Sequence, residues 1–308
     1  MQQRISGPSP PLAERLPPHA FFVVSAFFHY LGPSFAVLLF AHIEPLGVAW
    51  LRIASAALVF AVWRRPWRVL RDADRHLLIL IIGLAASLAA MNACFYLAID
   101  LLPLATVASI EFVAVIAVAL AGIRSLRNFS ALAVTLVGVY ALIGVAEGGA
   151  RLGLFFALLN AALFALYIVL GHAISRTGGA SGIDRLGAAM LLALVFAAPI
   201  GFRDAAPAFS SPALLLAGIG VGIASSVIPY VCDQLAMARL PRATFALMLA
   251  LLPAVAAIIG AIVLRQIPSP VELAGIALVG FGIAVHKPAG EKVTRAAPLA
   301  PPASADAP

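Results

Sequence analysis

The chain has 308 residues, of which 63% are hydrophobic and only 11% are charged, and its formal net charge is +7. Soluble domains carry about 45–50% apolar and about 25% charged residues. A soluble globule of this size could not bury so much apolar surface, because much of its accessible area must still face solvent. Disordered chains are excluded because they are poor in apolar residues. The composition therefore predicts a polytopic membrane protein.

Apolar stretches near 20 residues are long enough to cross about 30 Å of hydrocarbon as helices. The sequence has ten, at 20–41, 45–63, 76–98, 102–121, 128–146, 152–174, 184–202, 212–237, 240–264 and 268–286. It lacks the alternating segments of about ten residues that a β-barrel would need. The tails, 1–19 and 287–308, are rich in Pro, Ala and Ser and are predicted to be disordered. The predicted fold class is an all-α polytopic membrane protein with ten transmembrane helices.

The positive charges predict the orientation of these helices. If the amino terminus is cytoplasmic, sixteen Lys and Arg residues fall on the cytoplasmic side and only three, Arg151, Arg203 and Arg265, fall in the outer loops. Cytoplasmic loops of membrane proteins carry such an excess of Lys and Arg. Both termini are therefore predicted to be cytoplasmic, and the net positive charge needs no nucleic-acid partner.

An internal repeat appears at an offset of 138 residues, between segments 94–122 and 232–260, which share the motif LP-x-AT after a short loop. The offset equates predicted helices 3 and 4 with helices 8 and 9, so each unit has five helices. Because five is odd, the second unit must be inverted in the membrane. We expect a first repeat at 20–146 and a second, inverted repeat at 152–286. Inverted repeats are typical of secondary transporters, whose substrate site lies near the midplane between the halves.

Two charged residues, Arg52 and Glu111, lie deepest in the predicted spans. They stand seven and nine residues from the outer ends of their helices, which is about 10 and about 13 Å at about 1.5 Å per residue. A charge in the bilayer core costs from about 2.5 to more than about 10 kcal/mol, so it needs a reason. One interpretation is a structural ion pair that locks two helices together. The other is a substrate or proton site at a wet cavity, with Glu111 ionised by its partner and Arg52 available to a substrate carboxylate.

Further polar residues lie at a similar depth. The same arithmetic places Asn92 and Asn160 level with the charged pair, and His29 and Tyr30 slightly deeper. Together they predict a polar belt in the outer half of a central cavity. For each residue singly, the alternative is a hydrogen bond between helices.

Prolines and glycines mark special positions in the predicted helices. Pro33, Pro229 and Pro253 interrupt helices 1, 8 and 9, and we expect them to free backbone carbonyls and to kink these helices around a cavity. The spacing of Gly218 and Gly222 permits close packing of helix 8 against a neighbour.

Two other acids are interpreted as structural. Asp233 lies about four residues from the inner end of helix 8, where it can reach the interface. Glu272 follows Ser269 and Pro270 in the pattern of a capping box, in which a helix-terminal Ser and a Glu three residues later exchange hydrogen bonds with the backbone.

Motifs of catalysis are lacking in the sequence. It contains no H-E-x-x-H, no G-x-S-x-G and no P-loop. We therefore expect neither an enzyme nor an ATP-driven pump, and we predict no cofactor and no metal site.

Several strings are similar to those of a known family: WLRIASAALVF at 50–60, RPWR at 65–68, FYLAIDLLPLATVASIEF at 95–112, ALYIVLG at 165–171 and RLPRATFALMLALLPAVAAIIG at 239–260. With the predicted ten-helix inverted repeat, the chain resembles the drug/metabolite transporter superfamily, EamA branch, threonine/homoserine exporter type, over about 20–286. The resemblance implies export of small metabolites, often amino acids, across the bacterial inner membrane. It also adds Tyr167 to Arg52 and Glu111 as a matched position.

The sequence departs from this family pattern at two places. Leu252 precedes Pro253 where relatives commonly carry a Glu, and Arg265-Gln266 stands where a Gly-Glu pair is usual. Because of these departures, the resemblance does not predict the substrate range or the ion coupling.

The predicted function is a secondary transporter that exports amino acids or similar small metabolites across the inner membrane by alternating access. The alternatives are an exporter or facilitator of lipophilic drugs or other metabolites and, from another class, a non-transporting membrane scaffold. A wet cavity between the halves would count against the scaffold. The expected partners are a small-molecule substrate and the lipid bilayer, with proton coupling and the choice between monomer and homodimer left open.

Overall fold

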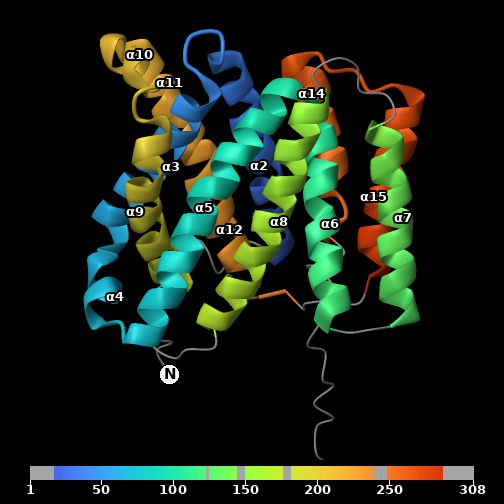
Figure 1. Ribbon diagram of the computed structural model, residues 1–308, viewed down its shortest axis with the longest axis horizontal. Helices are drawn as coiled ribbons and strands as arrows, with labels where there is room; N and C mark the ends of the chain where they lie inside the picture. Colours follow the sequence, from blue (N-terminus) through green and yellow to red (C-terminus); the bar gives the residue numbers. More distant parts are fainter. Residues whose placement is uncertain are drawn as a thin grey trace, which may run out of the picture.

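The computed structural model describes residues 17–122, 125–143, 150–175, 182–237, 239–240, 244 and 248–286. These residues form helices joined by short loops, and no strand occurs among them (Figure 1). The helices up to residue 143 are α2 (Pro18–Leu39), α3 (Pro45–Arg64), α4 (Trp67–Asp72), α5 (Arg75–Leu101), α6 (Leu104–Gly122) and α7 (Leu126–Ile143). Those from residue 150 onward are α8 (Ala150–Ser175), α9 (Gly182–Gly201), α10 (Ala206–Ser210), α11 (Pro212–Gly222), the π-helical turn η1 (Ile223–Val227), α12 (Ile228–Met237), α14 (Leu252–Leu264) and α15 (Pro270–Val285).

The described helices have the length and composition of membrane spans. Seven helical segments in the described chain are long and apolar enough to cross a membrane, and the run from α11 through η1 into α12 supplies one of them. Three further apolar helices, α6, α14 and α15, have shorter apolar stretches. The predicted all-helical membrane class is therefore confirmed, whereas the count of ten transmembrane helices stays a prediction.

Two predicted boundaries differ in detail from the structure. Helix 9 was expected over 240–264 with Pro253 interrupting it. In the described part of this range Thr244, Met248 and Leu249 are helical, Ala250 and Leu251 form a turn, and α14 follows over Leu252–Leu264. Pro253 therefore stands in the first turn, where its missing N–H needs no partner. Of the predicted tails, 1–16 and 287–308 lie outside the described residues, and α2 already begins at Pro18.

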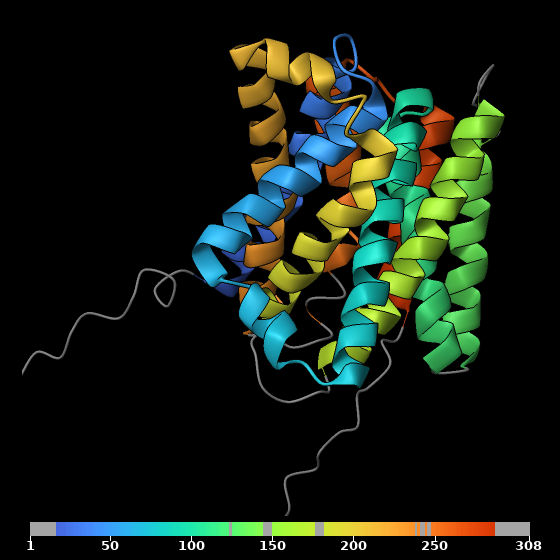
Figure 2. The same cartoon turned by 60° about the vertical axis from the view of Figure 1, so that its left-hand side comes forward.

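The helices form a central group with a pair of packed helices on each side of it. On one side α3 packs against α9, with α4 and α10 at opposite ends of this pair, and on the other side α7 packs against α15 (Figures 1 and 2). Between them lie α2, α5, α6, α8, α12 and α14. Every helix of this middle group contacts at least one other member of it.

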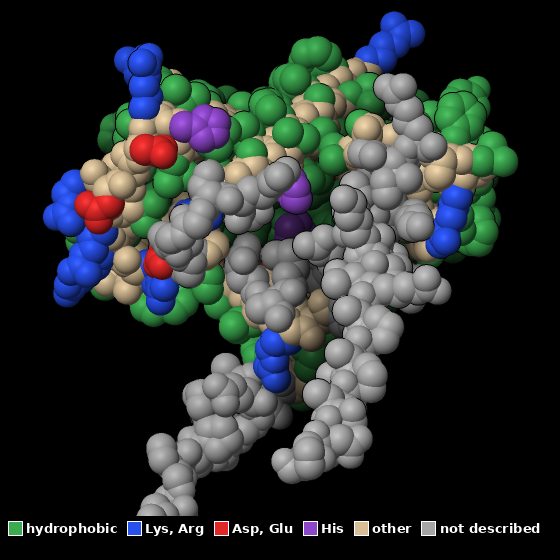
Figure 3. Space-filling model, turned by 90° about the horizontal axis from the view of Figure 1, so that it is seen from below, with side chains coloured by type: hydrophobic (Ala, Val, Ile, Leu, Met, Phe, Trp, Pro, Cys, Tyr) green, Lys and Arg blue, Asp and Glu red, His purple; other side chains and the backbone are tan. Residues whose placement is uncertain are grey.

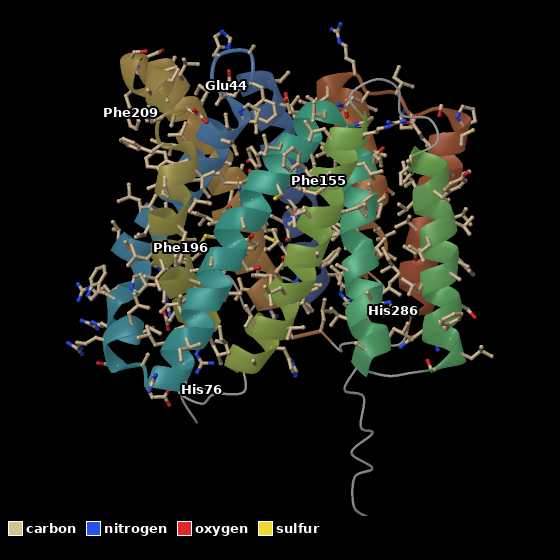
Figure 4. All side chains as sticks on the ribbon, in the orientation of Figure 1. Glu44, His76, Phe155, Phe196, Phe209 and His286 are labelled. Carbon is tan, nitrogen blue, oxygen red and sulfur yellow. The ribbon has the colours of Figure 1, made fainter. Side chains whose placement is uncertain are left out.

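The two ends of the bundle carry different polar side chains. Glu44, in the loop between α2 and α3, lies at the upper end, whereas His76 and His286 lie at the lower end (Figure 4). Seen from below, Lys and Arg side chains gather on the side of α4 (Figure 3). The flanks are apolar: Phe155, Phe196 and Phe209 are exposed, as lipid-facing side chains would be.

Both short motifs noted in the sequence have the predicted geometry. At the start of α15 the Ser269 hydroxyl accepts a hydrogen bond from the Glu272 amide at 3.3 Å, and the Glu272 carboxylate accepts one from the Ser269 amide at 2.7 Å. Gly218 and Gly222 lie directly against α3, where a methyl group on Gly218 would come 2.8 Å from Leu51 Cδ1. The capping box and the close packing are therefore confirmed.

Gly222 provides a test of this close packing. A methyl group there would lie 1.7 Å from Ser55 Oγ and 2.8 Å from the Arg52 carbonyl oxygen, whereas one on Gly220 would meet no atom within 4 Å. We expect Gly222→Ala to destabilise the detergent-solubilised protein by about 1–3 kcal/mol, since overpacking displaces the backbone. Gly220→Ala should leave the melting temperature unchanged or slightly raised. Equal melting temperatures for the two variants would contradict the described α3–α11 contact.

Candidate functional site

A polar cavity lies among the middle helices. It is lined by His29 and Pro33 of α2, Arg52 of α3, Met91, Asn92 and Phe95 of α5, Glu111 of α6, Asn160, Phe164 and Tyr167 of α8, and Tyr230 of α12. Its volume is about 40 Å³, which is room for about three water molecules. Six of the seven predicted site residues therefore line one cavity, and they come from both predicted repeats.

Arg52 is buried, with 5% of its surface exposed, and its guanidinium reaches from α3 to η1. Its Nε donates to Ser226 Oγ at 2.9 Å, and its Nη2 donates to the Ser225 carbonyl at 3.0 Å. The guanidinium carbon also lies 5.6 Å from the centre of the Tyr96 ring, close enough for a cation–π contact. Arg52 is thus held by main-chain and hydroxyl oxygens and by an aromatic ring.

The availability of the Ser225 carbonyl follows from the sequence. In a regular helix this carbonyl would accept from the amide four residues later, which belongs to Pro229, and proline has no N–H. The chain forms the π-helical turn η1 just before this proline. The prediction that Pro229 frees a backbone carbonyl is confirmed, and the donor that replaces the missing amide is Arg52.

Glu111 is also buried, with 7% of its surface exposed, and its partner is Asn160 of α8. Asn160 Nδ2 donates to Glu111 Oε1 at 3.3 Å. Arg52 and Glu111 line the same cavity, yet the described residues contain no ion pair between them within 4.0 Å. The direct ion pair that comparable depth permitted is therefore not formed in this structure.

The remaining predicted residues differ in their surroundings. Asn92 lines the cavity and donates from Nδ2 to the Leu88 carbonyl of its own helix at 2.8 Å. Tyr167 lines it and stacks on Phe164, with ring centres 5.9 Å apart. His29 lines it, and its ring lies in a T-shaped arrangement with the Tyr30 ring, with ring centres 5.2 Å apart. Tyr30 itself is fully buried but is not among the lining residues.

Four residues near Arg52 were not predicted from the sequence: Tyr96, Ser225, Ser226 and Tyr230. The available signal was a pair of serines three and four residues before a proline in an otherwise apolar helix. Tyr96 is fully buried, and its hydroxyl has no hydrogen-bond partner among the described residues. Asp233, which was expected to reach the inner interface, is partly buried and lies beside Ser25 of α2.

Comparison with known proteins places this chain in a class of membrane transporters. Residues 151–286 match the EamA-like transporter family. The threonine/homoserine exporters RhtA of Escherichia coli strain K12 and of Salmonella typhimurium strain LT2 are each 30% identical over 245 residues, which cover 79% of this chain and 81% of theirs. A solved crystal structure, 16% identical, shares the fold with a TM-score of 0.54 over 86% of this chain and 96% of that one.

The chain therefore belongs to the EamA-like transporter family. It is a multi-pass membrane protein, and its relatives are transporters rather than enzymes. The resemblance drawn from the short sequence strings is confirmed at the level of the family.

The contact between Arg52 and η1 can be tested at Ser226. Ser226→Ala removes the acceptor of Arg52 Nε and leaves a buried N–H of a charged group without a partner, so we expect a loss of about 1–3 kcal/mol in stability. The matched control is Ser225→Ala: this side chain is equally buried and donates within its own helix, whereas Arg52 uses the Ser225 backbone carbonyl. Thermal melts in detergent should show the larger loss for Ser226→Ala. A larger loss for Ser225→Ala would contradict the described role of Ser226.

Proposed function

We propose that this protein is a secondary transporter that exports amino acids or similar small metabolites across the bacterial inner membrane by alternating access. The observation that carries the proposal is the cavity itself: two buried, oppositely charged residues, Arg52 and Glu111, line it within a transporter-family fold. Its relatives named as threonine/homoserine exporters support an amino-acid substrate.

Alternating access needs two halves, and the packing of the helices supports two inverted five-helix repeats. Counted as ten, the helices are α2, α3, α5, α6 and α7 in the first half, and α8, α9, α11–α12, α14 and α15 in the second. In two such repeats, each helix of the first half corresponds to the helix five places later in the second half. The contact of α2 with α12 then corresponds to the contact of α8 with α5. The contact of α2 with α14 likewise corresponds to that of α8 with α6. The pairs α3–α9, α6–α14 and α7–α15 each join two corresponding helices, and all of them are in contact.

The lining of the cavity favours a small polar substrate over a lipophilic drug. Pockets for drug-sized ligands are mostly apolar, whereas this cavity has both signs of charge in its wall. A non-transporting scaffold gives no reason to bury these charges at such cost. A scaffold with a dry, apolar centre would avoid this cost.

The proposed orientation, with both termini in the cytoplasm, predicts which loops are accessible from each side. Single cysteines placed in the loop at 64–75 should react with a membrane-impermeant thiol reagent only in inverted vesicles, and one at Glu44 should react only in intact cells. The positive charges around α4 favour this result because cytoplasmic loops are rich in Arg. A carboxyl tail that reacts from outside the cell would contradict the ten-helix arrangement.

Transport can be measured directly in proteoliposomes or inverted vesicles. We expect saturable uptake of at least one small polar amino acid from a panel, compared with protein-free liposomes and repeated with and without a pH gradient to detect proton coupling. If no amino acid in the panel is transported by folded protein, the proposed substrate class is wrong.

Arg52 and Glu111 should both be needed for this activity. We expect Arg52→Ala and Glu111→Ala to reduce uptake at least about tenfold, because each truncation removes a charged group from a site of low dielectric. The exchange Arg52→Glu with Glu111→Arg should not restore uptake, since a carboxylate at position 52 would face the Ser225 carbonyl. Arg203→Ala, an exposed loop variant, is the control. Wild-type uptake by both single variants would show that the two charges have no part in transport.

A further inference from the structure

We propose that the cavity binds its substrate as a zwitterion, with the substrate carboxylate on Arg52 and the substrate ammonium group on Glu111. The inference rests on the proposed transport function and assigns a different substrate group to each of the two charges. It replaces the idea of an Arg52–Glu111 ion pair by a pair of separate charges that the substrate joins.

The first observation is that the two buried charges form no direct ion pair. Both are more than nine-tenths buried and line one cavity, but their nitrogen and oxygen atoms are more than 4.0 Å apart. Buried opposite charges that stay unpaired are unfavourable in a site of low dielectric. An α-amino acid carries a carboxylate and an ammonium group on one carbon, so it can contact both charges at once.

The second observation is that Arg52 is held in place and still has donors to offer. Its contacts with Ser225 and Ser226 use two of the five guanidinium N–H groups. The other N–H groups of Arg52 therefore remain for a ligand in the cavity. A fixed guanidinium suits a carboxylate, which it can bind through two parallel hydrogen bonds.

The third observation lies on the acidic side of the cavity. Asn160 is fully buried, and its Oδ1 has no hydrogen-bond partner among the described residues. Its Nδ2 faces the Glu111 carboxylate, which orients the amide so that Oδ1 is the free acceptor. An ammonium group has three donors and no acceptor. Glu111 and Asn160 Oδ1 together offer the acceptors that such a group needs.

The expected consequence is selectivity for charge pattern rather than for shape. A substrate that has only a carboxylate leaves Glu111 without a counter-charge, and one that has only an ammonium group leaves Arg52 without one. Threonine provides a matched set of probes: 3-hydroxybutyrate lacks its amino group, and 1-aminopropan-2-ol lacks its carboxylate. All three keep the hydroxyl and the methyl group.

The test measures uptake, or inhibition of threonine uptake, for the three probes in proteoliposomes of the full chain. We expect the wild type to prefer threonine to either analogue by roughly ten- to a hundredfold, as for a lost hydrogen bond to a charged group. In Glu111→Gln the preference over 3-hydroxybutyrate should fall to nearly one, whereas the preference over 1-aminopropan-2-ol should persist. Glu44→Gln, which removes an exposed carboxylate at the upper end of the bundle, should keep both preferences.

The outcomes separate this inference from the proposed function. Threonine uptake without discrimination against 3-hydroxybutyrate would overturn the zwitterion site while leaving the exporter intact. A Glu111→Gln variant that keeps both preferences but loses the response to a pH gradient would make Glu111 a proton carrier, and the inference would be wrong. If no amino acid is transported at all, the proposed function fails, and this inference fails with it. The probe series on the wild type decides the question even if the variant does not fold.

Discussion

In hydrocarbon every backbone carbonyl must find its donor inside the protein, and at the Ser225 carbonyl that donor is Arg52. Pro229 cannot supply the amide that would close the regular helix, so α12 is preceded by a π-helical turn whose open carbonyl faces α3. This single requirement fixes a guanidinium at the cavity wall. It also joins α3 of the first predicted repeat to the run α11–η1–α12 of the second, where Gly222 lets the two backbones approach.

Because η1 and Tyr96 satisfy part of the guanidinium, Arg52 is not compelled to bind Glu111. Glu111 instead receives a hydrogen bond from Asn160 on α8. The two charges thus belong to different hydrogen-bond groups that meet at one small cavity. The site stays polar in the membrane, because the two charges form no ion pair with each other.

The sequence predicted the membrane class and the positions of most helices, and six of the seven predicted site residues line the cavity. Apolar length and depth along a helix are local properties, so the sequence contains them. Depth does not fix the direction in which a side chain points, so it could not decide whether Arg52 would bind Glu111 or η1. The same limit explains Tyr30. It follows His29 at nearly the same depth, but one residue turns the helix by about 100°, and only His29 lines the cavity. The donor to a carbonyl that proline leaves free depends on which helix packs beside that carbonyl. No local sequence pattern contains this information.

The departures from the family pattern lie away from the cavity. Neither Leu252 nor the pair Arg265-Gln266 is among its lining residues. Arg265 has a φ of 57°, in the left-handed region that favours glycine, which is the residue that the resemblance leads us to expect at this position. Gln266 Oε1 accepts a hydrogen bond from the Leu104 amide at 3.0 Å, a role that a carboxylate oxygen could also fill. The cavity wall itself contains Arg52, Glu111 and Tyr167, the three positions that match the family pattern in the sequence.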